Sequence, residues 1–320
     1  MGIKNGIGEK KNILNKNLHK ARHNKQDDFY TQLTDIEKEL KHYKKHFKNK
    51  VVFCNCDDPR ISNFFHYFSY NFEQLGLKKL ITTCYKNQQI NLFSENKSEK
   101  AIYLEYTGGK GNIPDVKEIG IKHLKGDGDF RSQECIDLLK KADIVVTNPP
   151  FSLFREYVGQ LIKYNKRFLI IGNVNAISYK EIFKLIKENK IWLGYNCVRH
   201  FKKPDGSMYE TARAFWYTNL DIEKRHEDLI LYKTYKGHEE EYPKYDDYEA
   251  INVNKATEIP ADYKGVMGVP ITFLDRYNPD QFDILGLDDH RLVYPEWRGR
   301  GPSLNGKTIY RRIIIKNKKI

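Results

Sequence analysis

The chain has 320 residues, 40% of them hydrophobic and 13% aromatic, which allows a large buried core and excludes a disordered protein. Lysine and arginine number 55 against 42 acidic residues, and the formal charge of +13 favours a polyanionic partner such as nucleic acid. A lysine-rich proteome would give the same excess, so charge alone does not identify the partner. No apolar run approaches the roughly 18 residues of a membrane span, and we expect a cytoplasmic protein without membrane contact.

The chain has five cysteines, an odd number, which is typical of reduced thiols in the cytoplasm. Cys54 and Cys56 form a C-x-C pair. No second Cys or His pair follows at the spacing of a zinc site, so we expect no bound metal.

The first segment, residues 1–26, carries seven lysines and arginines against one acid, Glu9. It has few large apolar residues, which predicts a flexible basic arm. Such an arm follows a phosphate backbone in some proteins and is a solvated tail in others. The sequence leaves both readings open.

Apolar periodicity from residue 28 onwards predicts helices and strands in alternation. An alternation of this kind indicates an α/β fold with a doubly wound, mostly parallel sheet. Such sheets bind ligands at the carboxyl ends of their strands. The predicted helices cover residues 28–47, 64–75, 152–164 and 179–190, and the predicted strands 51–54, 79–85, 101–106, 143–147, 168–172, 191–195 and 214–218.

The alternation ends near residue 235, where an acidic, tyrosine-rich stretch begins. Five prolines then punctuate an irregular segment. We therefore predict a catalytic domain over 27–235 and an irregular α+β region over 236–320.

The sharpest motif is Asn148-Pro149-Pro150-Phe151, directly after the strand predicted over 143–147. An exocyclic amine of a base is a poor nucleophile, and methyl transfer to it needs acceptors for its N–H groups. The Asn148 side chain and the Pro149 carbonyl can serve as these acceptors, while Phe151 can stack on a base taken out of a duplex. Such loops also serve cytosine N4, RNA adenine and protein glutamine. A plain Pro-Pro turn would leave Phe151 in the core.

Two polar turns are candidates for holding the methyl donor, S-adenosylmethionine. Asn55-Cys56-Asp57-Asp58-Pro59 follows the first predicted strand, where a carboxylate can bind the α-amino group of the cofactor. Asp129 and Phe130 follow a glycine turn, where a carboxylate and a ring can hold the adenine. Phe29-Tyr30-Thr31 could close over the carboxylate end. Ordinary turns and a first helical turn explain the same residues.

Two basic clusters are candidates for DNA contact. Arg298 and Arg300 are separated by one glycine in a C-terminal segment rich in lysine and arginine. Arg199, Lys202 and Lys203 follow the strand predicted to end at Tyr195. We expect one cluster to enter the major groove and the other to fix the backbone, against the alternative of solvated basic faces.

With these segments in order, the chain resembles the EcoRI-type adenine-specific DNA methyltransferases over most of its length from residue 27. The resemblance implies a Rossmann-like fold, S-adenosylmethionine as the cofactor and transfer to adenine N6 in a short sequence of double-stranded DNA. It makes GAATTC the first target to test and places target contacts mainly in the C-terminal part. It assigns Asn148–Phe151 to the catalytic loop, Asp129 and Phe130 to the cofactor's adenine, and Asp57, Asp58 and Thr31 to its methionine end.

The chain departs from the wider methyltransferase pattern in two places. Its first strand is followed by Asn55–Pro59 in place of a glycine-rich turn, and residues 82–87 lack the acid that usually binds the ribose. These departures leave open a DNA-binding protein with a decayed cofactor site. We expect a monomer, because no apolar stripe remains once the core is assigned.

Overall fold

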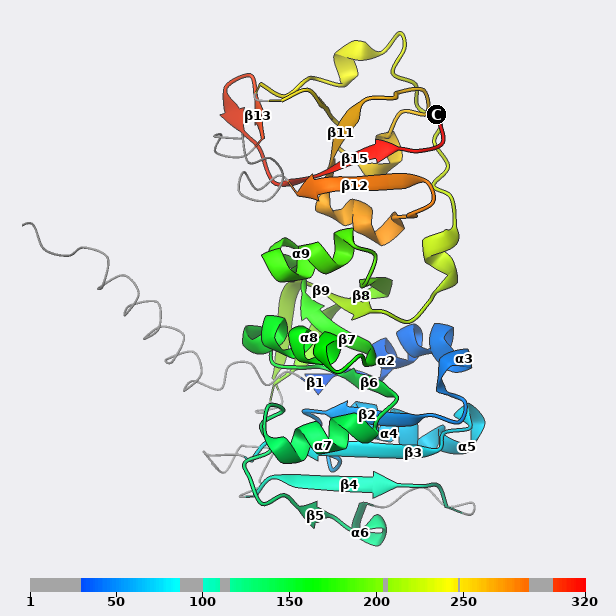
Figure 1. The fold of residues 1–320 in the computed structure, drawn as a ribbon, viewed down its shortest axis with the longest axis vertical. Coiled ribbons are helices and arrows are strands. Elements are labelled where there is room, and N and C mark those ends of the chain that lie inside the picture. The colour runs from blue at the N-terminus through cyan, green and yellow to red at the C-terminus, as the bar shows by residue number, and fades with distance from the viewer. Residues whose placement is uncertain (1–29, 87–99, 110–115, 204–206, 247, 288–301) are drawn as a thin grey trace, which may run out of the picture.

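The computed structural model describes residues 30–86, 100–109, 116–203, 207–246, 248–287 and 302–320 (Figure 1). Phe29, Arg298 and Arg300 lie outside these ranges, as does the whole of the predicted basic arm, residues 1–26. Nine strands form the main sheet in the order β1-β8-β9-β7-β6-β2-β3-β4-β5. Their bounds are β1 Tyr30–Thr31, β2 Val51–Asn55, β3 Lys79–Cys84, β4 Ile102–Tyr106, β5 Lys122–His123, β6 Ile144–Thr147, β7 Arg167–Asn173, β8 Trp192–Lys202 and β9 Met208–Thr218.

The centre of the sheet consists of four parallel strands, β3, β2, β6 and β7. Every residue of β2 and β6 is buried, as expected for strands covered on both faces. The outer pairs are antiparallel, so three of the eight neighbouring pairs are parallel. The α/β class predicted from the sequence is confirmed, but the sheet is mixed rather than mostly parallel.

Helices cover both faces of this sheet (Figure 1). Alternate residues of β2 belong to two separate hydrophobic clusters, because successive side chains of a strand point to opposite faces. One cluster includes α2 Leu33–Leu40, α3 Lys44–Phe47, α4 Asn63–Tyr70 and α5 Phe72–Leu75; the other includes α7 Gln133–Lys141, α8 Phe154–Lys163 and α9 Lys180–Lys187. A short α6, Val116–Ile119, lies beside β4.

The helix predicted over residues 28–47 is shorter and interrupted. Tyr30 and Thr31 pair with Lys202 and Phe201 of β8, so the helix begins only at Leu33. The strand predicted over 191–195 continues to Lys202, and the strand predicted over 214–218 begins at residue 208. The sequence signal failed here because β8 contains a bulge, which breaks its two-residue alternation.

A buried carboxylate, that of Glu39 in α2, fixes this bulge. It accepts hydrogen bonds of 2.8 Å from the backbone N–H groups of Tyr195 and Asn196, and another of 2.8 Å from the Tyr43 hydroxyl. Burial raises the pKa of Glu39, while these donors oppose the rise. The Glu39 carboxylate therefore accepts hydrogen bonds from backbone N–H groups that strand pairing leaves without a partner at the bulge.

The C-terminal part contains a second sheet, in the order β10-β11-β15-β12, where the sequence predicted an irregular region. From residue 236 onwards, the described residues form 3₁₀ helices but no α-helix. The sequence signal was weak because the strands are short and separated by proline-rich turns. The bounds are β10 Ile251–Asn252, β11 Val266–Pro270, β12 Phe282–Leu287 and β15 Arg312–Asn317. A division near residue 235 stays a prediction.

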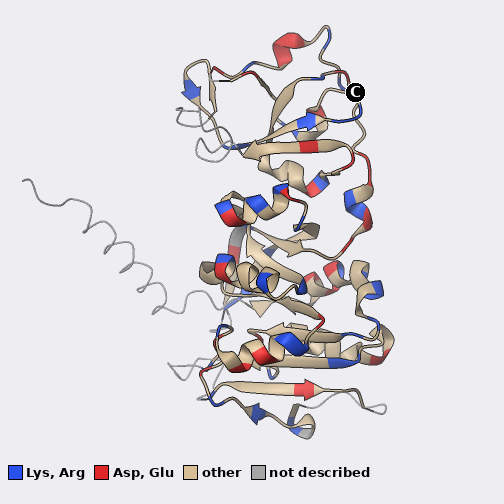
Figure 2. Cartoon of the chain, viewed as in Figure 1, with Lys and Arg blue, Asp and Glu red and all other residues tan. Residues whose placement is uncertain are grey.

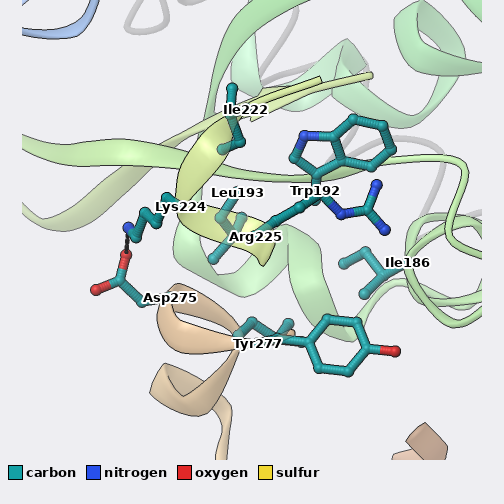
Figure 3. A pocket seen from close by; sticks show the side chains of 9 residues that line it. Ile186, Trp192, Leu193, Ile222, Lys224, Arg225, Asp275 and Tyr277 are labelled. Carbon is teal, nitrogen blue, oxygen red and sulfur yellow. Dashed lines mark hydrogen bonds and ion pairs between the residues drawn. The ribbon is translucent and has the colours of Figure 1, made fainter. Parts of the chain in front are cut away.

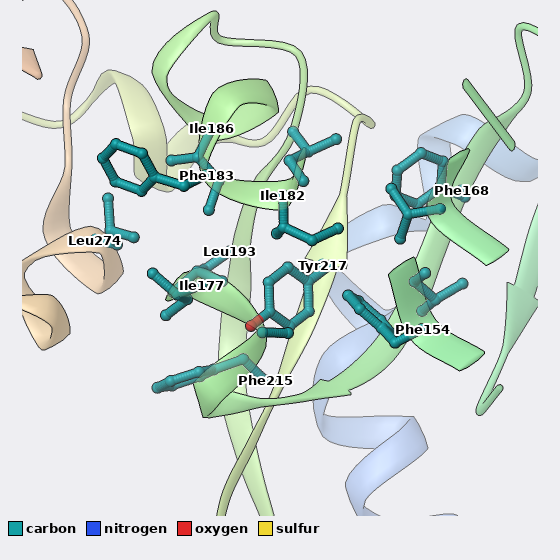
Figure 4. Packing of buried hydrophobic residues seen from close by; sticks show 14 of the residues in the cluster. Phe154, Phe168, Ile177, Ile182, Phe183, Ile186, Leu193, Phe215, Tyr217 and Leu274 are labelled. Atoms are coloured by element: carbon teal, nitrogen blue, oxygen red, sulfur yellow. The ribbon is translucent and has the colours of Figure 1, made fainter. Parts of the chain in front are cut away.

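Helix α9 connects the two sheets. Its residues Ile182, Phe183 and Ile186 are buried in a cluster that also contains Leu274 of the 3₁₀ helix η7, Ile271–Arg276 (Figure 4). The Lys187 ammonium donates a 2.6 Å hydrogen bond to the Leu285 carbonyl of β12. One continuous apolar core therefore runs from the main sheet into the second one.

A small pocket lies at the same junction (Figure 3). The Arg225 guanidinium lies 3.8 Å from the centre of the Trp192 ring, and the Lys224 ammonium forms a 2.6 Å ion pair with Asp275. Trp192 begins β8, so this pocket lies at the amino end of that strand, opposite the end that bears Lys202. Within the described ranges, the helices are too short or too polar for any of them to cross a lipid bilayer.

The packing of Gly172 in β7 predicts a matched pair of glycine substitutions. A Cβ at Gly172 would lie 2.4 Å from the Phe154 ring, whereas a Cβ at Gly159 in α8 would meet no atom within 4 Å. We expect Gly172→Ala to lower the free energy of unfolding by about 1–3 kcal/mol, because the core is overpacked. Gly159→Ala should raise it by up to about 1 kcal/mol, because alanine favours the helix. Urea unfolding of both variants checks this, and equal effects would contradict it.

Candidate active site

Two of the predicted site segments lie side by side at the carboxyl edge of the main sheet. Strands β2 and β6 pair in parallel, with Val52 opposite Ile144 and Phe53 opposite Val145. The Asn55–Pro59 turn and the Asn148–Phe151 loop therefore leave the sheet at the same edge. This is where parallel sheets bind ligands.

The Asp57 carboxyl group connects these two segments. The Thr147 hydroxyl lies 2.5 Å from Asp57 Oδ2 and also contacts the Asn55 carbonyl, while the Ser62 hydroxyl donates a 2.8 Å hydrogen bond to Asp57 Oδ1. The Asp57 N–H donates to the Thr83 carbonyl at 2.8 Å. Asp57 is thus held by β2, β3 and β6 together.

The protonation of Asp57 follows from its surroundings. Burial raises the pKa of this carboxyl to about 7, although the hydrogen bonds from Thr147 and Ser62 lower it. The Thr147 hydroxyl has one proton but contacts two oxygen acceptors, those of Asn55 and Asp57. A protonated Asp57 supplies the second proton, so the geometry and the raised pKa agree.

The rest of the turn is rigid and buried. Arg60 holds the Asp58 carboxylate through two nitrogens, at 2.9 Å from Nε and 2.5 Å from Nη2. Asn55 is buried and its side-chain oxygen accepts a 3.3 Å hydrogen bond from the Thr83 hydroxyl. Cys56 has a φ of 83°, a left-handed conformation that favours glycine. The turn thus contains a left-handed backbone conformation at a residue other than glycine.

The Asn148–Phe151 loop is buried at Pro149 and partly exposed at its other three residues. The Pro150 carbonyl accepts a 3.0 Å hydrogen bond from the Leu153 N–H, which starts a 3₁₀ turn (Phe151–Leu153) ahead of α8. The Phe151 ring packs edge-on against Phe201 of β8, with 5.9 Å between ring centres. The loop therefore offers a polar amide and part of an aromatic ring to a ligand.

The Asp129 segment lies at the same edge. Gly128 packs so closely on the end of β3 that a Cβ would lie 2.7 Å from the Cys84 carbonyl oxygen. The Asp129 carboxylate is held by two nitrogens of Arg131, at 2.9 and 2.7 Å. The Phe130 ring is only 4% exposed and packs edge-on against Tyr157, at 5.0 Å. Asp129 is thus positioned toward the edge, whereas Phe130 belongs mainly to the core.

Strand β1 brings Tyr30 and Thr31 to this edge as well. The Thr31 carbonyl accepts a 2.8 Å hydrogen bond from the Asn63 side chain at the start of α4. The Thr31 hydroxyl is buried, and within the described part of the chain it has no hydrogen-bond partner. A buried hydroxyl of this kind needs a polar neighbour, which a bound ligand can supply.

Two of the predicted basic residues, Arg199 and Lys202, lie on β8 itself, and Lys203 directly follows it. Arg199 and Lys202 are exposed on the strand, and the Lys203 ammonium lies 5.3 Å from the centre of the Tyr209 ring. Phe201, between them, is buried against Phe151. The Asn148–Phe151 loop and a basic hairpin therefore share an aromatic contact. Figure 2 shows where lysine and arginine lie on the ribbon.

Sequence reasoning missed the residues that position this site. Thr147 and Ser62 hold Asp57, Arg131 holds Asp129, and Phe201 packs against Phe151 of the Asn148–Phe151 loop. Thr147 had one signal, a polar residue ending a buried strand. The other contacts join distant parts of the sequence or ordinary turn residues, and no pattern marks them.

The raised pKa of Asp57 predicts a pH dependence of stability. Its ordinary value is 3.8 and its folded value about 7, so the folded protein holds an extra proton between these limits. The free energy of unfolding should therefore fall as the pH rises through this window, by up to about 1.4 kcal/mol per pH unit. Asp57→Asn should remove this slope, whereas Asp137→Asn, at an exposed carboxylate of α7, should keep it. Thermal melting from pH 5 to 7.5 measures both, and a wild-type slope in the Asp57 variant would contradict the assignment.

Comparison with known proteins agrees with this arrangement. The profile of a family described as the adenine-specific methyltransferase EcoRI matches residues 17–318. The type II methyltransferase M.EcoRI of Escherichia coli is 52% identical, with 97% of the chain and 99% of that relative covered. M.MgeORF184P of Mycoplasma genitalium is 38% identical (95% and 99% covered), and M.MpnI of Mycoplasma pneumoniae 36% (94% and 98%). No solved structure matches significantly. The chain belongs to the EcoRI family of adenine-specific methyltransferases.

Proposed function

We propose that this adenine-specific methyltransferase takes one adenine out of duplex DNA at a specific short sequence and methylates its N6 amine. The observation that carries the proposal is the Asn148–Phe151 loop, held at the carboxyl edge through Thr147 and packed against a basic hairpin. Its relatives are type II methyltransferases, which favours a role in restriction-modification, with GAATTC the first target to test. Parallel central strands with helices on both faces support a Rossmann-like, doubly wound fold.

The residues at the carboxyl edge fit S-adenosylmethionine, which supplies a methyl group on a positively charged sulfur. The buried Thr31 hydroxyl suits the cofactor's carboxylate end. Asp57 and Asp58 are proposed to face the α-amino group, whose N–H groups can donate to their carboxyl oxygens, and Asp129 is proposed to accept from the adenine amine. Tyr30, Asn55, Pro59 and Phe130 would shape the surrounding walls.

The catalytic loop supports methyl transfer through hydrogen bonding and not through a general base. The Asn148 side-chain oxygen and the Pro149 carbonyl accept the two N–H groups of the adenine amine, which lets its nitrogen become pyramidal. They also stabilise the positive charge that develops on this nitrogen, and this charge is removed when one N–H proton is lost to solvent after transfer. Phe151 stacks on the extruded base, and its contact with Phe201 limits the movement of its ring.

DNA contact is proposed for the same edge. Arg199, Lys202 and Lys203 lie on the hairpin that packs against the catalytic loop, where they can reach phosphates beside the extruded base. Arg298 and Arg300 are proposed as target contacts from the sequence alone. We expect the enzyme to act on DNA as a monomer.

The proposal predicts that Asn148→Ala strongly slows methyl transfer without weakening DNA binding. Losing one acceptor should lower kcat by roughly 100- to 1,000-fold, because the amine loses its transition-state partner. Asn175→Ala, at an exposed position after the neighbouring strand β7, serves as the matched control and should keep most of the rate. Tritium transfer from labelled cofactor to duplex DNA measures the rate, and fluorescence anisotropy the affinity.

Digestion of the product to nucleosides separates the competing functions. N6-methyladenine from duplex DNA supports the proposal, whereas N4-methylcytosine or preferential labelling of RNA contradicts it. DNA binding without any transfer would indicate a binding protein that has lost catalysis. Retained transfer by Asn148→Ala would remove the assignment of this side chain.

A further inference from the structure

A second hairpin, in the C-terminal part, has the geometry of a rigid β-ribbon. It consists of β13, Ser303–Leu304, and β14, Lys307–Thr308, paired antiparallel. Asn305 and Gly306 connect them with φ values of 51° and 73°. Two successive positive φ angles at Asn-Gly are the pattern of a type I′ turn, which matches the twist of the strands.

The Asp246 carboxylate fixes the tip of this hairpin. It accepts hydrogen bonds from the backbone N–H groups of both turn residues, at 3.0 Å from Asn305 and 2.8 Å from Gly306. The Asp246 N–H also donates to the Ser303 carbonyl at 2.9 Å. Two-stranded hairpins are only marginally stable alone, so this anchor gives the ribbon a defined position.

The hairpin presents one cationic side chain, that of Lys307, and an exposed aromatic side chain, that of Tyr310, follows two residues after β14. Residues 305–308 are all exposed, and Tyr310 is 68% exposed, which is unusual for so large a ring. No acidic residue occurs between 302 and 320, and Figure 2 shows lysine and arginine on this hairpin and on β15. Hydrophobic burial explains neither the exposed ring nor the exposed Lys307.

The hairpin is connected to the main sheet through buried packing. Tyr310 is followed closely by β15, whose residues Ile313, Ile314 and Ile315 are buried at the centre of the second sheet. That sheet shares its core with α9 and thus with the main sheet. In Figure 1 the hairpin lies on the same side of the molecule as the carboxyl ends of β2 and β3. A duplex along this side would meet both the catalytic edge and the hairpin.

We propose that the β13–β14 hairpin enters the major groove of the target duplex, where Lys307 and Tyr310 contact base edges and set the sequence preference. The inference rests on the proposed DNA substrate and goes beyond it by naming the element that reads the sequence. The major groove admits a two-stranded β-ribbon, and lysine binds the O6 and N7 acceptors of guanine there. Asp246 is a positioning residue, because it holds the ribbon in its reading orientation.

Selection from a duplex library with ten randomised central base pairs tests the inference without requiring methyl transfer. The full-length protein should enrich one short motif. Lys307→Ala and Tyr310→Ala should each relax the preference at one or two positions of that motif by roughly 10-fold or more. Lys236→Ala removes the same charge from an exposed position between β9 and the second sheet, and should leave the motif intact.

The Asp246→Ala variant distinguishes an effect of the hairpin's position from an effect of the protein's charge. This substitution removes a negative charge, which should strengthen binding to random DNA, yet we expect it to relax the motif as the Lys307 variant does. Asp246→Asn keeps one acceptor oxygen and should restore part of the preference. Melting temperatures within a few degrees of the wild type exclude unfolding as the cause.

Three outcomes would overturn the inference. These are a wild type that enriches no motif, variants that select the unchanged motif, and variants that lose affinity equally for all sequences, which would leave only phosphate contact. Methyl transfer to duplex DNA is measured in parallel. A wild type that selects a motif but transfers no methyl group would contradict the proposed function while leaving the reading role of the hairpin intact.

Discussion

The site depends on one contact, between the hydroxyl of Thr147 and the buried carboxyl of Asp57. Parallel pairing brings β2 and β6 together, but it fixes only their backbones and not the loops that follow. The shared proton joins the two loops at the point where each leaves the sheet. Because Thr147 directly precedes Asn148, a movement of the Asp57 turn would also move the Asn148 amide. The segments proposed to hold the cofactor and the base are therefore joined by this one contact.

Much of the main sheet was predictable, because fully buried strands such as β2 and β6 are continuous apolar runs with a turn at each end. The predictions failed where tertiary contacts override the local pattern. The β8 bulge exists because Glu39, far away in sequence, satisfies its N–H groups. The second sheet escaped prediction because its strands are short, and β15 finds its partners β11 and β12 only through long loops.

The chemistry proposed for the candidate site comes from Asn148–Phe151, since four consecutive residues carry the whole sequence signal. The contacts that surround this loop could not be predicted from the sequence. The hydrogen bonds from Arg131 to Asp129 and the contact between Phe201 and Phe151 depend on how the strands are ordered in space. The local pattern of a single sequence does not show that order. The same holds for the β13–β14 hairpin. Asn305-Gly306 indicates a turn, but only the fold reveals that Asp246 anchors it.

Strand β1 has only two residues, yet it determines where everything before Tyr30 joins the body. Its pairing with Phe201 and Lys202 places that junction one strand spacing, about 4.8 Å, from the basic edge of β8. The C-terminus lies on the other side of the molecule, at the end of the second sheet (Figure 1). A duplex at the proposed edge would therefore lie beside the point where Tyr30 enters the main sheet, and away from Ile320.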